Sequence, residues 1–409
     1  MQYRRVSLSQ TLFIHAQGKE LERQNRKVYK FGFGQSPFAP PQYVLEALRD
    51  NIHHKEYSLV QGDETLRYYA ARFHAQVHGI PATPEHTLIG PGSKMLLYTI
   101  LMAYPPSDVL ISAPSWVSYG PQAKMAGHHV IRIPTGFGLR WRITPRQLLR
   151  AMSKKIHPHS ILIINYPGNP DGLSYSEKEL SELAEIARRH RMLVISDEIY
   201  ALLTFEGVHH SFARFYPERT IVTTGLSKWC GAGGWRLGVA FLYPSISRKF
   251  KDSILGVASE TYSCAPVPVQ HAARTAYRDI HAALDYAERQ RNILRQVAQY
   301  CYEALLRAGV QVHRPQGAFY MFPDFSPFRE KLHRRGIYNA RQLCQTLLTD
   351  TGVMLLPASA FGMHNLLLAA RLSYVDFDDP LTKEDFDIRR DCPRIVEGMQ
   401  LLTDWLRKL

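Results

Sequence analysis

The sequence predicts a doubly wound α/β fold with a mostly parallel sheet. Short, continuously apolar runs recur along the chain, as in strands that are buried on both faces. Segments with helical periodicity separate these runs, and several of the runs stop at Gly, Pro, Asn or Asp. A chain of 409 residues with 45% hydrophobic and 21% charged residues is typical of an ordinary globular protein with two associated domains.

The clearest unit lies in the middle of the chain. The run ILIINYP at 161–167 predicts a buried strand that ends at a Pro/Gly/Asn cluster. A helix follows, because Ser176 and Glu179 form a capping box and the next apolar residues recur on one face. The run MLVIS at 192–196 predicts a second strand. A strand, a helix and a strand in this order form a right-handed βαβ unit with parallel strands.

Other segments extend this pattern on both sides. Three more apolar runs add strands to the same sheet, and three segments with helical periodicity predict helices. The last of these helices stops at Gly309, as a helix with a C-terminal glycine does. The additional strands are expected at 109–112, 129–133 and 220–225, and the helices at 41–52, 95–104 and 279–308.

The charge and the cysteines exclude several classes of protein. The net charge of +14 is spread along the chain, and its densest patches, at 187–192 and 329–335, read as solvated helix faces. We recognise no nucleic-acid-binding motif, so we expect no nucleic-acid partner. A DNA-binding regulator that uses a cofactor stays the alternative of a different class, although the segment before Phe31 is short for a separate DNA-binding domain.

The five cysteines are too far apart for a paired metal or redox motif. The first residues lack the apolar centre of a signal peptide, and the apolar run at 95–104 is too short to span a bilayer. We therefore expect a cytoplasmic protein with no membrane contact. The histidine pairs at 53–54, 128–129 and 209–210 suggest a metal, but adjacent side chains diverge, and we expect none.

Chemically useful residues follow the predicted strands. In doubly wound sheets, ligands bind beyond the carboxyl ends of the strands. Lys228 follows one strand and Asp197 another, while Gly92, Ser93 and Lys94 open a helix. A lysine amine can form a Schiff base, a carboxylate can keep a pyridine nitrogen protonated, and backbone N–H groups at a helix start can bind phosphate. The cofactor that this combination suggests is pyridoxal 5'-phosphate (PLP).

Several motifs, in order along the chain, resemble those of one family. They are FGFGQSPF, YSLVQGDETLR, GPGSK, PSWVSYG, NYPGNPDG, SDEIY, SKWCGAGGWRLG, GAFYMFP and ARLSY. The chain thus resembles, over residues 30–374, the class I/II (fold-type I) PLP-dependent aminotransferases, of which aspartate aminotransferase is the familiar member.

The resemblance implies a fold and a set of domains. A large domain would hold a mostly parallel seven-stranded sheet flanked by helices, and a smaller α/β domain would accompany it. We expect an N-terminal arm and part of the small domain at 1–45, the large PLP-binding domain at 46–285 and the small C-terminal domain at 286–409.

Residue by residue, the resemblance implies a catalytic set of Lys228, Asp197 and Tyr200. Lys228 would form the Schiff base and move the proton of the substrate, and Asp197 would face the pyridine nitrogen. Tyr200 and Asn169 would hydrogen-bond the phenolic oxygen, and Trp116 would stack on the ring.

The resemblance also assigns residues to the phosphate and to the substrate. Arg371 would bind the substrate α-carboxylate, together with Asn169 and the backbone of Gly34. Tyr57 would reach the phosphate of a neighbouring subunit, which implies a homodimer. The phosphate of the same subunit would lie against Gly92, Ser93, Lys94, Ser227 and Arg236.

Some positions depart from the family's usual residues. Gly225 stands where many members have a phosphate-binding serine, so Thr224 or Ser227 is expected to substitute. The motif NPDG replaces NPTG, and we expect its extra carboxylate, Asp171, to face solvent. GQSPF replaces the common GEPDF, which alters a loop near the substrate.

The positions that bind a second substrate carboxylate in aspartate-specific members correspond to Ser259 and Ser7, neither of which is cationic. Arg4, Arg5 or His15 could supply the charge instead, so acidic, aromatic and aliphatic amino donors all stay open. We predict a ping-pong aminotransferase that acts on an L-amino acid and a 2-oxo acid. A C–S lyase or an enzyme similar to aminocyclopropane carboxylate synthase, with the same residues, is the alternative.

Overall fold

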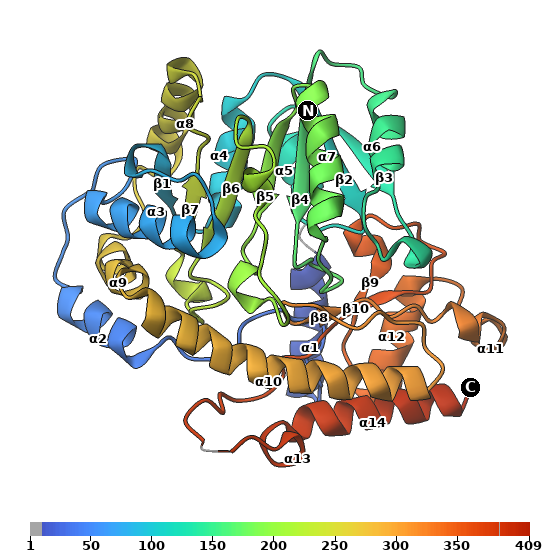
Figure 1. The fold of residues 1–409 in the computed structure, drawn as a ribbon. Helices are drawn as coiled ribbons and strands as arrows, with labels where there is room; N and C mark the ends of the chain where they lie inside the picture. The colour runs from blue at the N-terminus through green and yellow to red at the C-terminus, as the bar shows by residue number, and fades with distance from the viewer. Residues whose placement is uncertain (1–9, 384) are drawn as a thin grey trace, which may run out of the picture.

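The computed structural model describes residues 10–383 and 385–409, and two sheets organise them (Figure 1). The larger sheet has seven strands in the order β1-β7-β6-β5-β4-β2-β3. Neighbouring strands from β6 to β3 are parallel, while β7 runs antiparallel to both of its neighbours. The predicted fold, a mostly parallel seven-stranded sheet, is confirmed. The strands are β1 (Thr87–Gly90), β2 (Ser107–Ala113), β3 (His129–Pro134), β4 (His159–Asn165), β5 (Leu193–Asp197), β6 (Thr220–Gly225) and β7 (Gly238–Phe241).

Helices cover both faces of this sheet because its central strands are apolar on both sides. In β4, Ile161 and Ile163 pack in a core with α4, α5 and α8, whereas Leu162 and Ile164 pack in a core with α6 and α7. The capping box of Ser176 forms at the start of α7, as predicted. These helices are α4 (Ser93–Ala103), α5 (Tyr119–Met125), α6 (Pro145–Met152), α7 (Glu177–Arg189) and α8 (Arg248–Thr261); α2 (Gln42–Asn51), α3 (Glu64–His78) and α9 (Val267–Arg278) pack together at the side of β1 and β7.

The smaller sheet has the order β8-β10-β9 and is antiparallel. The 28-residue helix α10 (Ile280–Arg307) leads to it from the larger sheet and packs against α14 (Figure 1). The first part of the chain joins this region, because the Ser373 N–H donates to the Phe31 carbonyl at 2.7 Å. The domain boundaries themselves stay a prediction. The remaining elements are α1 (Gln10–Arg23), β8 (Tyr320–Met321), α11 (Arg329–Arg334), α12 (Ala340–Thr351), β9 (Leu356–Pro357), β10 (Ala370–Ser373), α13 (Ile388–Asp391) and α14 (Pro393–Arg407).

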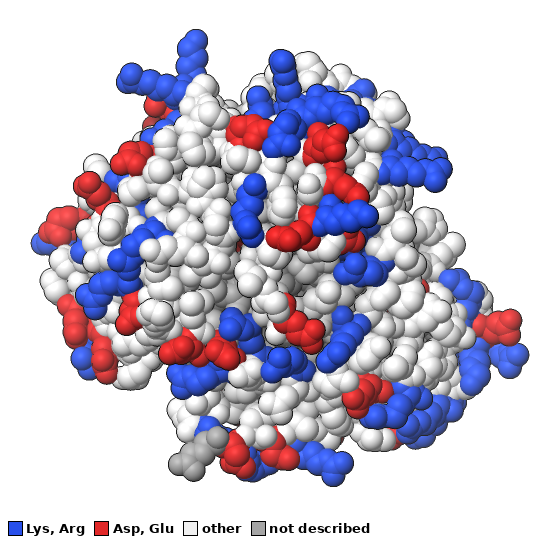
Figure 2. Space-filling view, in the orientation of Figure 1, with Lys and Arg blue, Asp and Glu red and all other residues white. Residues whose placement is uncertain are grey.

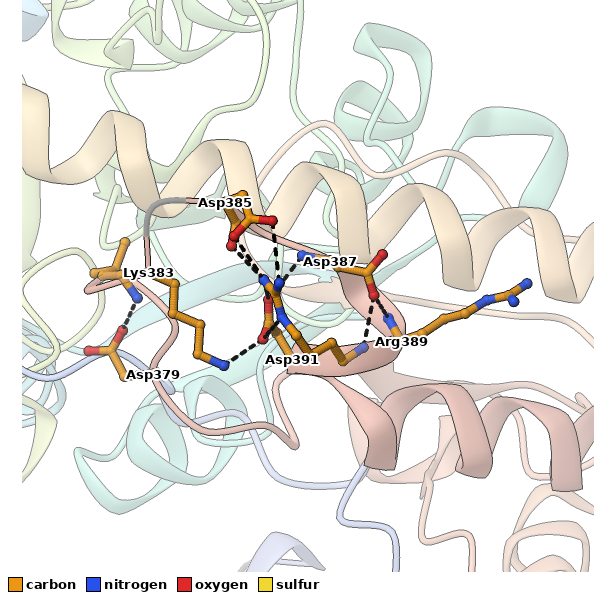
Figure 3. A network of polar contacts seen from close by, with 8 residues as sticks. Asp379, Lys383, Asp385, Asp387, Arg389 and Asp391 are labelled. Carbon is orange, nitrogen blue, oxygen red and sulfur yellow. Dashed lines mark hydrogen bonds and ion pairs between the residues drawn. The ribbon is translucent and has the colours of Figure 1, made fainter.

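A polar network fixes the segment that leads into α14 (Figure 3). Arg390 and Lys383 both contact the Asp391 carboxylate, and Arg390 also contacts Asp385. These cations, Arg390 above all, hold the pKa of Asp391 below its ordinary value. Asp387 caps α13 by accepting hydrogen bonds from two backbone N–H groups. The network adds to the apolar contacts that Phe386, Ile388 and Cys392 make with the main core.

The surface carries Lys and Arg interspersed with Asp and Glu on the face shown in Figure 2. This distribution matches the diffuse charge expected from the sequence and shows no basic stripe on that face. Within residues 10–383 and 385–409, no helix is long and apolar enough to cross a membrane.

Candidate active site

A cavity of about 630 Å³ opens beyond the carboxyl ends of β4, β5 and β6. Its volume falls within the range of about 300–1,000 Å³ that small-molecule sites occupy, and its position is the one expected for a doubly wound sheet. The structure brings most of the predicted site residues into its lining. They are Gly34, Ser93, Lys94, Trp116, Asn169, Asp197, Tyr200, Ser227, Lys228, Arg236 and Arg371.

Lys228 extends into the cavity from the turn that follows β6. Its Nζ donates to the Gly34 carbonyl at 3.0 Å and lies 5.5 and 5.3 Å from the ring centroids of Tyr200 and Phe319. These contacts leave the amine half-buried, with aromatic faces around its charge. A carbonyl and two rings hold the amine without neutralising it, so it is available to a ligand.

Asp197 ends β5 and is 3% exposed. Its Oδ2 accepts a 2.7 Å hydrogen bond from Tyr119 Oη, whereas Oδ1 is buried and has no hydrogen-bond partner among the described residues. Burial raises the pKa of Asp197 to about 6, and the Tyr119 hydrogen bond opposes this shift. A buried carboxylate oxygen without a donor indicates that a ligand N–H or O–H belongs beside it.

The backbone of Asp197 is tied to the neighbouring strand through Asn165. The Asn165 Nδ2 donates to the Asp197 carbonyl at 2.8 Å, and its Oδ1 accepts the Asn169 backbone N–H at 2.8 Å. One asparagine at the end of β4 therefore fixes both the strand end that carries Asp197 and the turn that carries Asn169.

Tyr200 and Tyr320 form a buried pair of phenols with 3.0 Å between their Oη atoms. Burial raises the pKa of Tyr200, and the neighbouring Tyr320 raises it further. Tyr320 Oη also donates weakly to the Gly34 carbonyl, at 3.4 Å. A Cβ on Gly34 would overlap that Oη, so the close approach of backbone and phenol requires glycine at this position.

Arg371 enters the cavity from β10 and is 3% exposed. Its Nη1 donates to Asn169 Oδ1 at 3.0 Å and its Nη2 to the Gly32 carbonyl at 2.7 Å, while its buried Nε has no partner among the described residues. The Tyr320 and Phe361 rings lie 4.6 and 5.2 Å from the guanidinium carbon. No carboxylate of the described residues pairs with this buried cation, so it lacks an anion that a substrate could provide.

Three cationic or N–H groups meet at one corner of the cavity. Helix α4 begins at Ser93 after Gly92, which has φ 89°, and its N-terminus points partial positive charge outward. Lys94 Nζ lies 5.1 Å from the Trp116 ring centroid. Arg236 donates to the carbonyls of Gly233 and Pro91, at 2.8 and 3.3 Å. Burial lowers the pKa of Lys94, and Arg236 lowers it further, so this corner favours an anion.

Gly92 does not line the cavity itself, but a Cβ there would overlap Arg236 Nη2. Its role is therefore to leave room for Arg236. Ser227 lines the cavity and Thr224 does not, which favours Ser227 as the hydroxyl that replaces the one missing at Gly225. Tyr57 is 88% exposed on the loop between α2 and α3, outside the lining.

The prediction for Asp171 is wrong. We expected its carboxylate to face solvent, but it is 4% exposed and forms an ion pair with the equally buried Arg142. The partner lies 29 residues earlier in the chain, so the turn motif alone gave no sign of it.

No second carboxylate-binding cation takes the expected positions among the described residues. Ser259 lies exposed on α8, outside the cavity lining. Ser7, Arg4 and Arg5 lie outside the described residues, and so does the side chain of His15. The lining also includes residues to which we had assigned no role, among them Phe33, Gln35, Tyr119, Asn165 and Tyr320. Tyr119 stands three residues after Trp116 in the motif PSWVSYG, and this position was the only sign of it in the sequence. Its contact with Asp197 gave no sign, because the two residues are 78 positions apart.

The chain is similar in sequence and in overall fold to known proteins. The model of the family described as aminotransferase class I and II matches residues 26–376. An aspartate aminotransferase of Bacillus sp. (strain YM-2) is 32% identical, over 90% of this chain and 92% of that protein. An asparagine–oxo-acid transaminase of Streptococcus mutans is 30% identical, over 90% and 92%. The structure of the Thermus thermophilus aspartate aminotransferase with maleate superposes with a TM-score of 0.86, at 26% identity, over 99% and 100% of the two chains.

Proposed function

The chain belongs to the class I and II aminotransferase family and is an aminotransferase, and we propose that pyridoxal phosphate is the group its cavity holds. The observation that carries this proposal is the pairing of Lys228 with Asp197. Asp197 ends β5 and Lys228 follows the adjacent parallel strand β6, both line one cavity, and Asp197 Oδ1 is buried without a donor. A pyridine ring with a protonated nitrogen supplies the missing N–H.

The residues present fit this cofactor at each of its polar groups. The α4 N-terminus, Ser227, Lys94 and Arg236 form the corner that favours the phosphate. Tyr200 and Asn169 line the same cavity and would be partners for the phenolic oxygen, and Trp116 would offer a ring face. Bound there, pyridoxal phosphate supplies an aldehyde that accepts the amino group and a ring that withdraws electrons from the substrate Cα–H bond.

Lys228 has two tasks in this proposal. Its Nζ would hold the cofactor covalently before the substrate arrives, and afterwards it would take the proton from the substrate Cα and deliver it to the carbon of the cofactor's former aldehyde group. The Gly34 carbonyl, which accepts from Nζ at 3.0 Å, holds the amine against the lining of the cavity. A base that is fixed in this way moves one proton over a short path, without a water molecule as carrier.

Arg371 binds the α-carboxylate of the amino acid and of the 2-oxo acid. Asn169 and the Gly32 carbonyl orient its guanidinium, and the rings of Tyr320 and Phe361 keep water away from it. Because the cation has no carboxylate partner in the described part of the chain, binding the substrate replaces an uncompensated buried charge by an ion pair.

A homodimer is part of the proposal. Tyr57 is exposed and lies outside the cavity, together with the exposed apolar side chains of Ile52 and Leu59 on the same loop region. A second copy that covers this region would bury these side chains and bring Tyr57 to the partner's phosphate corner.

The visible absorption spectrum of protein loaded with pyridoxal phosphate tests the function. L-aspartate, L-asparagine and L-phenylalanine are added one at a time without any 2-oxo acid. We expect at least one donor to convert the spectrum to that of pyridoxamine phosphate and a 2-oxo acid to reverse the change. Release of pyruvate and ammonia instead would assign the chain to the lyases, and a protein that binds no pyridoxal phosphate would refute the proposal.

A further inference from the structure

The turn Gly168–Gly172 carries Asn169 between β4 and α7, and it contains a buried charge that the reaction does not use. The Gly168 N–H donates to the Leu173 carbonyl at 2.9 Å, and the Gly172 N–H donates to the Gly168 carbonyl at 2.8 Å. These bonds close the turn upon itself. Asn169 then projects from it toward Arg371, whose Nη1 donates to Asn169 Oδ1 at 3.0 Å.

Asp171 is the acidic residue of this turn. Its Oδ1 accepts the Leu173 backbone N–H at 2.8 Å and also contacts Arg142 Nη2. Both side chains are buried, with exposures of 4% and 5%. A Cβ on Gly168 would lie 2.5 Å from Asp171 Oδ1 and 3.0 Å from Arg142 Nη2. The ion pair therefore packs directly against the residue before Asn169.

Arg142 is itself held in place from two sides. Its Nε donates to the Arg140 carbonyl at 3.2 Å, and its guanidinium carbon lies 5.0 Å from the Tyr175 ring centroid. Tyr175 Oη in turn accepts the Ile143 backbone N–H at 3.1 Å. A carboxylate that pairs with such a fixed guanidinium has little freedom, so the turn that contains it has little freedom as well.

Neither charge of this pair has a second ionic partner in the described part of the chain. Removal of one partner leaves the other as an uncompensated buried charge, which displaces the surrounding structure more than loss of both. Such a displacement would move Gly168, because the side chains of Asp171 and Arg142 lie directly against it. Asn169, the next residue, would move with it.

We propose that Asp171 and Arg142 are positioning residues, a buried ion pair that sets the place of Asn169 Oδ1 and, through it, the guanidinium of Arg371 that receives the substrate carboxylate. The inference rests on the proposed role of Arg371. The ion pair also explains how a buried aspartate can stand in the turn next to the cavity. The acid would be unfavourable there without the arginine that the preceding segment supplies.

A double-mutant cycle tests the inference with Asp171→Asn, Arg142→Met and the combination of both. Asparagine keeps an oxygen for the Leu173 N–H, so Asp171→Asn removes the charge with little change of shape. Each single variant should raise KM for the amino donor about tenfold while kcat changes less. The double variant should be no worse than either single variant, because both changes break one contact.

The matched control is the ion pair of Arg188 with Glu218, which lies outside the cavity lining with side-chain exposures of 49% and 42%. Arg188→Met and Glu218→Gln should leave KM within about twofold of the wild-type value. Single variants at Asp171 and Arg142 that behave like this control, or effects that multiply in the double variant, would overturn the inference. If Arg142→Met does not fold, Arg142→Lys takes its place, with a smaller rise of KM expected because the charge remains.

A second measurement does not depend on aminotransfer. Hydrogen–deuterium exchange in the cofactor-free protein follows the backbone amides of residues 168–173. Both single variants should exchange faster there than the wild type and the control variants. Unchanged exchange would overturn the inference even in an active enzyme. If the single variants exchange faster but the wild type loaded with pyridoxal phosphate transfers no amino group, the ion pair's role in the turn is supported and the proposed function is refuted.

Discussion

Replacement of Asp197 by asparagine should change how the stability of the cofactor-free protein depends on pH. Burial raises the pKa of Asp197 from an ordinary value of 3.8 to about 6, although Tyr119 donates a hydrogen bond to it. In the folded protein this carboxyl therefore keeps a proton, between about pH 4 and 6, that the unfolded chain has already lost. The folded state binds more protons than the unfolded state in this interval, so its stability falls as the pH rises.

The size of the effect follows from the shift. A difference of about two pKa units corresponds to about 3 kcal/mol of free energy of unfolding, at about 1.36 kcal/mol per unit. The group is buried, so solvent screening does not reduce this contribution much. The stabilising contribution is present below about pH 4 and is lost as the pH passes about 6. The asparagine side chain of the variant does not titrate, so the variant lacks this pH dependence.

Urea unfolding of the cofactor-free wild type and of Asp197→Asn at pH 4, 5, 6 and 7 measures the difference. The protein concentration must be constant, because dimerisation would contribute to the stability. The free energy of unfolding of the wild type minus that of the variant should fall by about 2.4 kcal/mol from pH 4 to pH 7, which is most of the full contribution. Glu206→Gln, at an exposed carboxylate, is the control. Parallel curves for the wild type and Asp197→Asn would refute the reasoning, whatever their absolute offset.

Three further changes have defined expectations. Lys228→Ala should lower the rate of amino transfer by about 10²- to 10⁴-fold in single-turnover assays, because the variant lacks the base. Its circular dichroism spectrum should be retained, because the substitution removes no side chain of the buried core. Arg371→Lys should raise KM for donor and acceptor alike by about 10- to 100-fold in steady-state kinetics, because a point charge cannot reproduce the guanidinium fork. Tyr119→Phe should raise the pKa of Asp197 further and so move the fall of the stability–pH curve to higher pH, because it removes a hydrogen bond that favours the charged form. A curve that coincides with that of the wild type would show that Tyr119 does not act on Asp197.

The sequence alone predicted the central parallel strands and the residues at their ends. Short apolar runs such as 161–167 and 220–225 identify strands buried on both faces. The four-residue strands β1 and β7 were missed, because such short runs have no periodicity of their own and form by pairing with each other. Lys228 and Asp197 were found because each follows a recognisable strand.

The contacts between side chains of distant segments could not be predicted in this way. The Tyr119 hydrogen bond to Asp197 joins residues that are 78 positions apart, and the Tyr200–Tyr320 pair joins residues 120 apart. A single sequence contains no signal for either contact. Asp171 was predicted to be exposed and is buried, for the same reason. A turn motif shows the local backbone geometry but not the distant arginine that pairs with the aspartate.

The hydrogen bonds of the cavity also bear on the time course of folding. Lys228 bonds to Gly34 across 194 positions, Arg371 to Asn169 across 202, and Arg371 to Gly32 across 339. Each contact closes a long loop, and the entropy of closing such loops has to be lost before the contacts can stabilise the chain. The cavity is therefore complete only after both sheets have formed and met. A cofactor that needs this cavity can trap the finished protein, and slow its unfolding, but it cannot guide the early chain toward its fold.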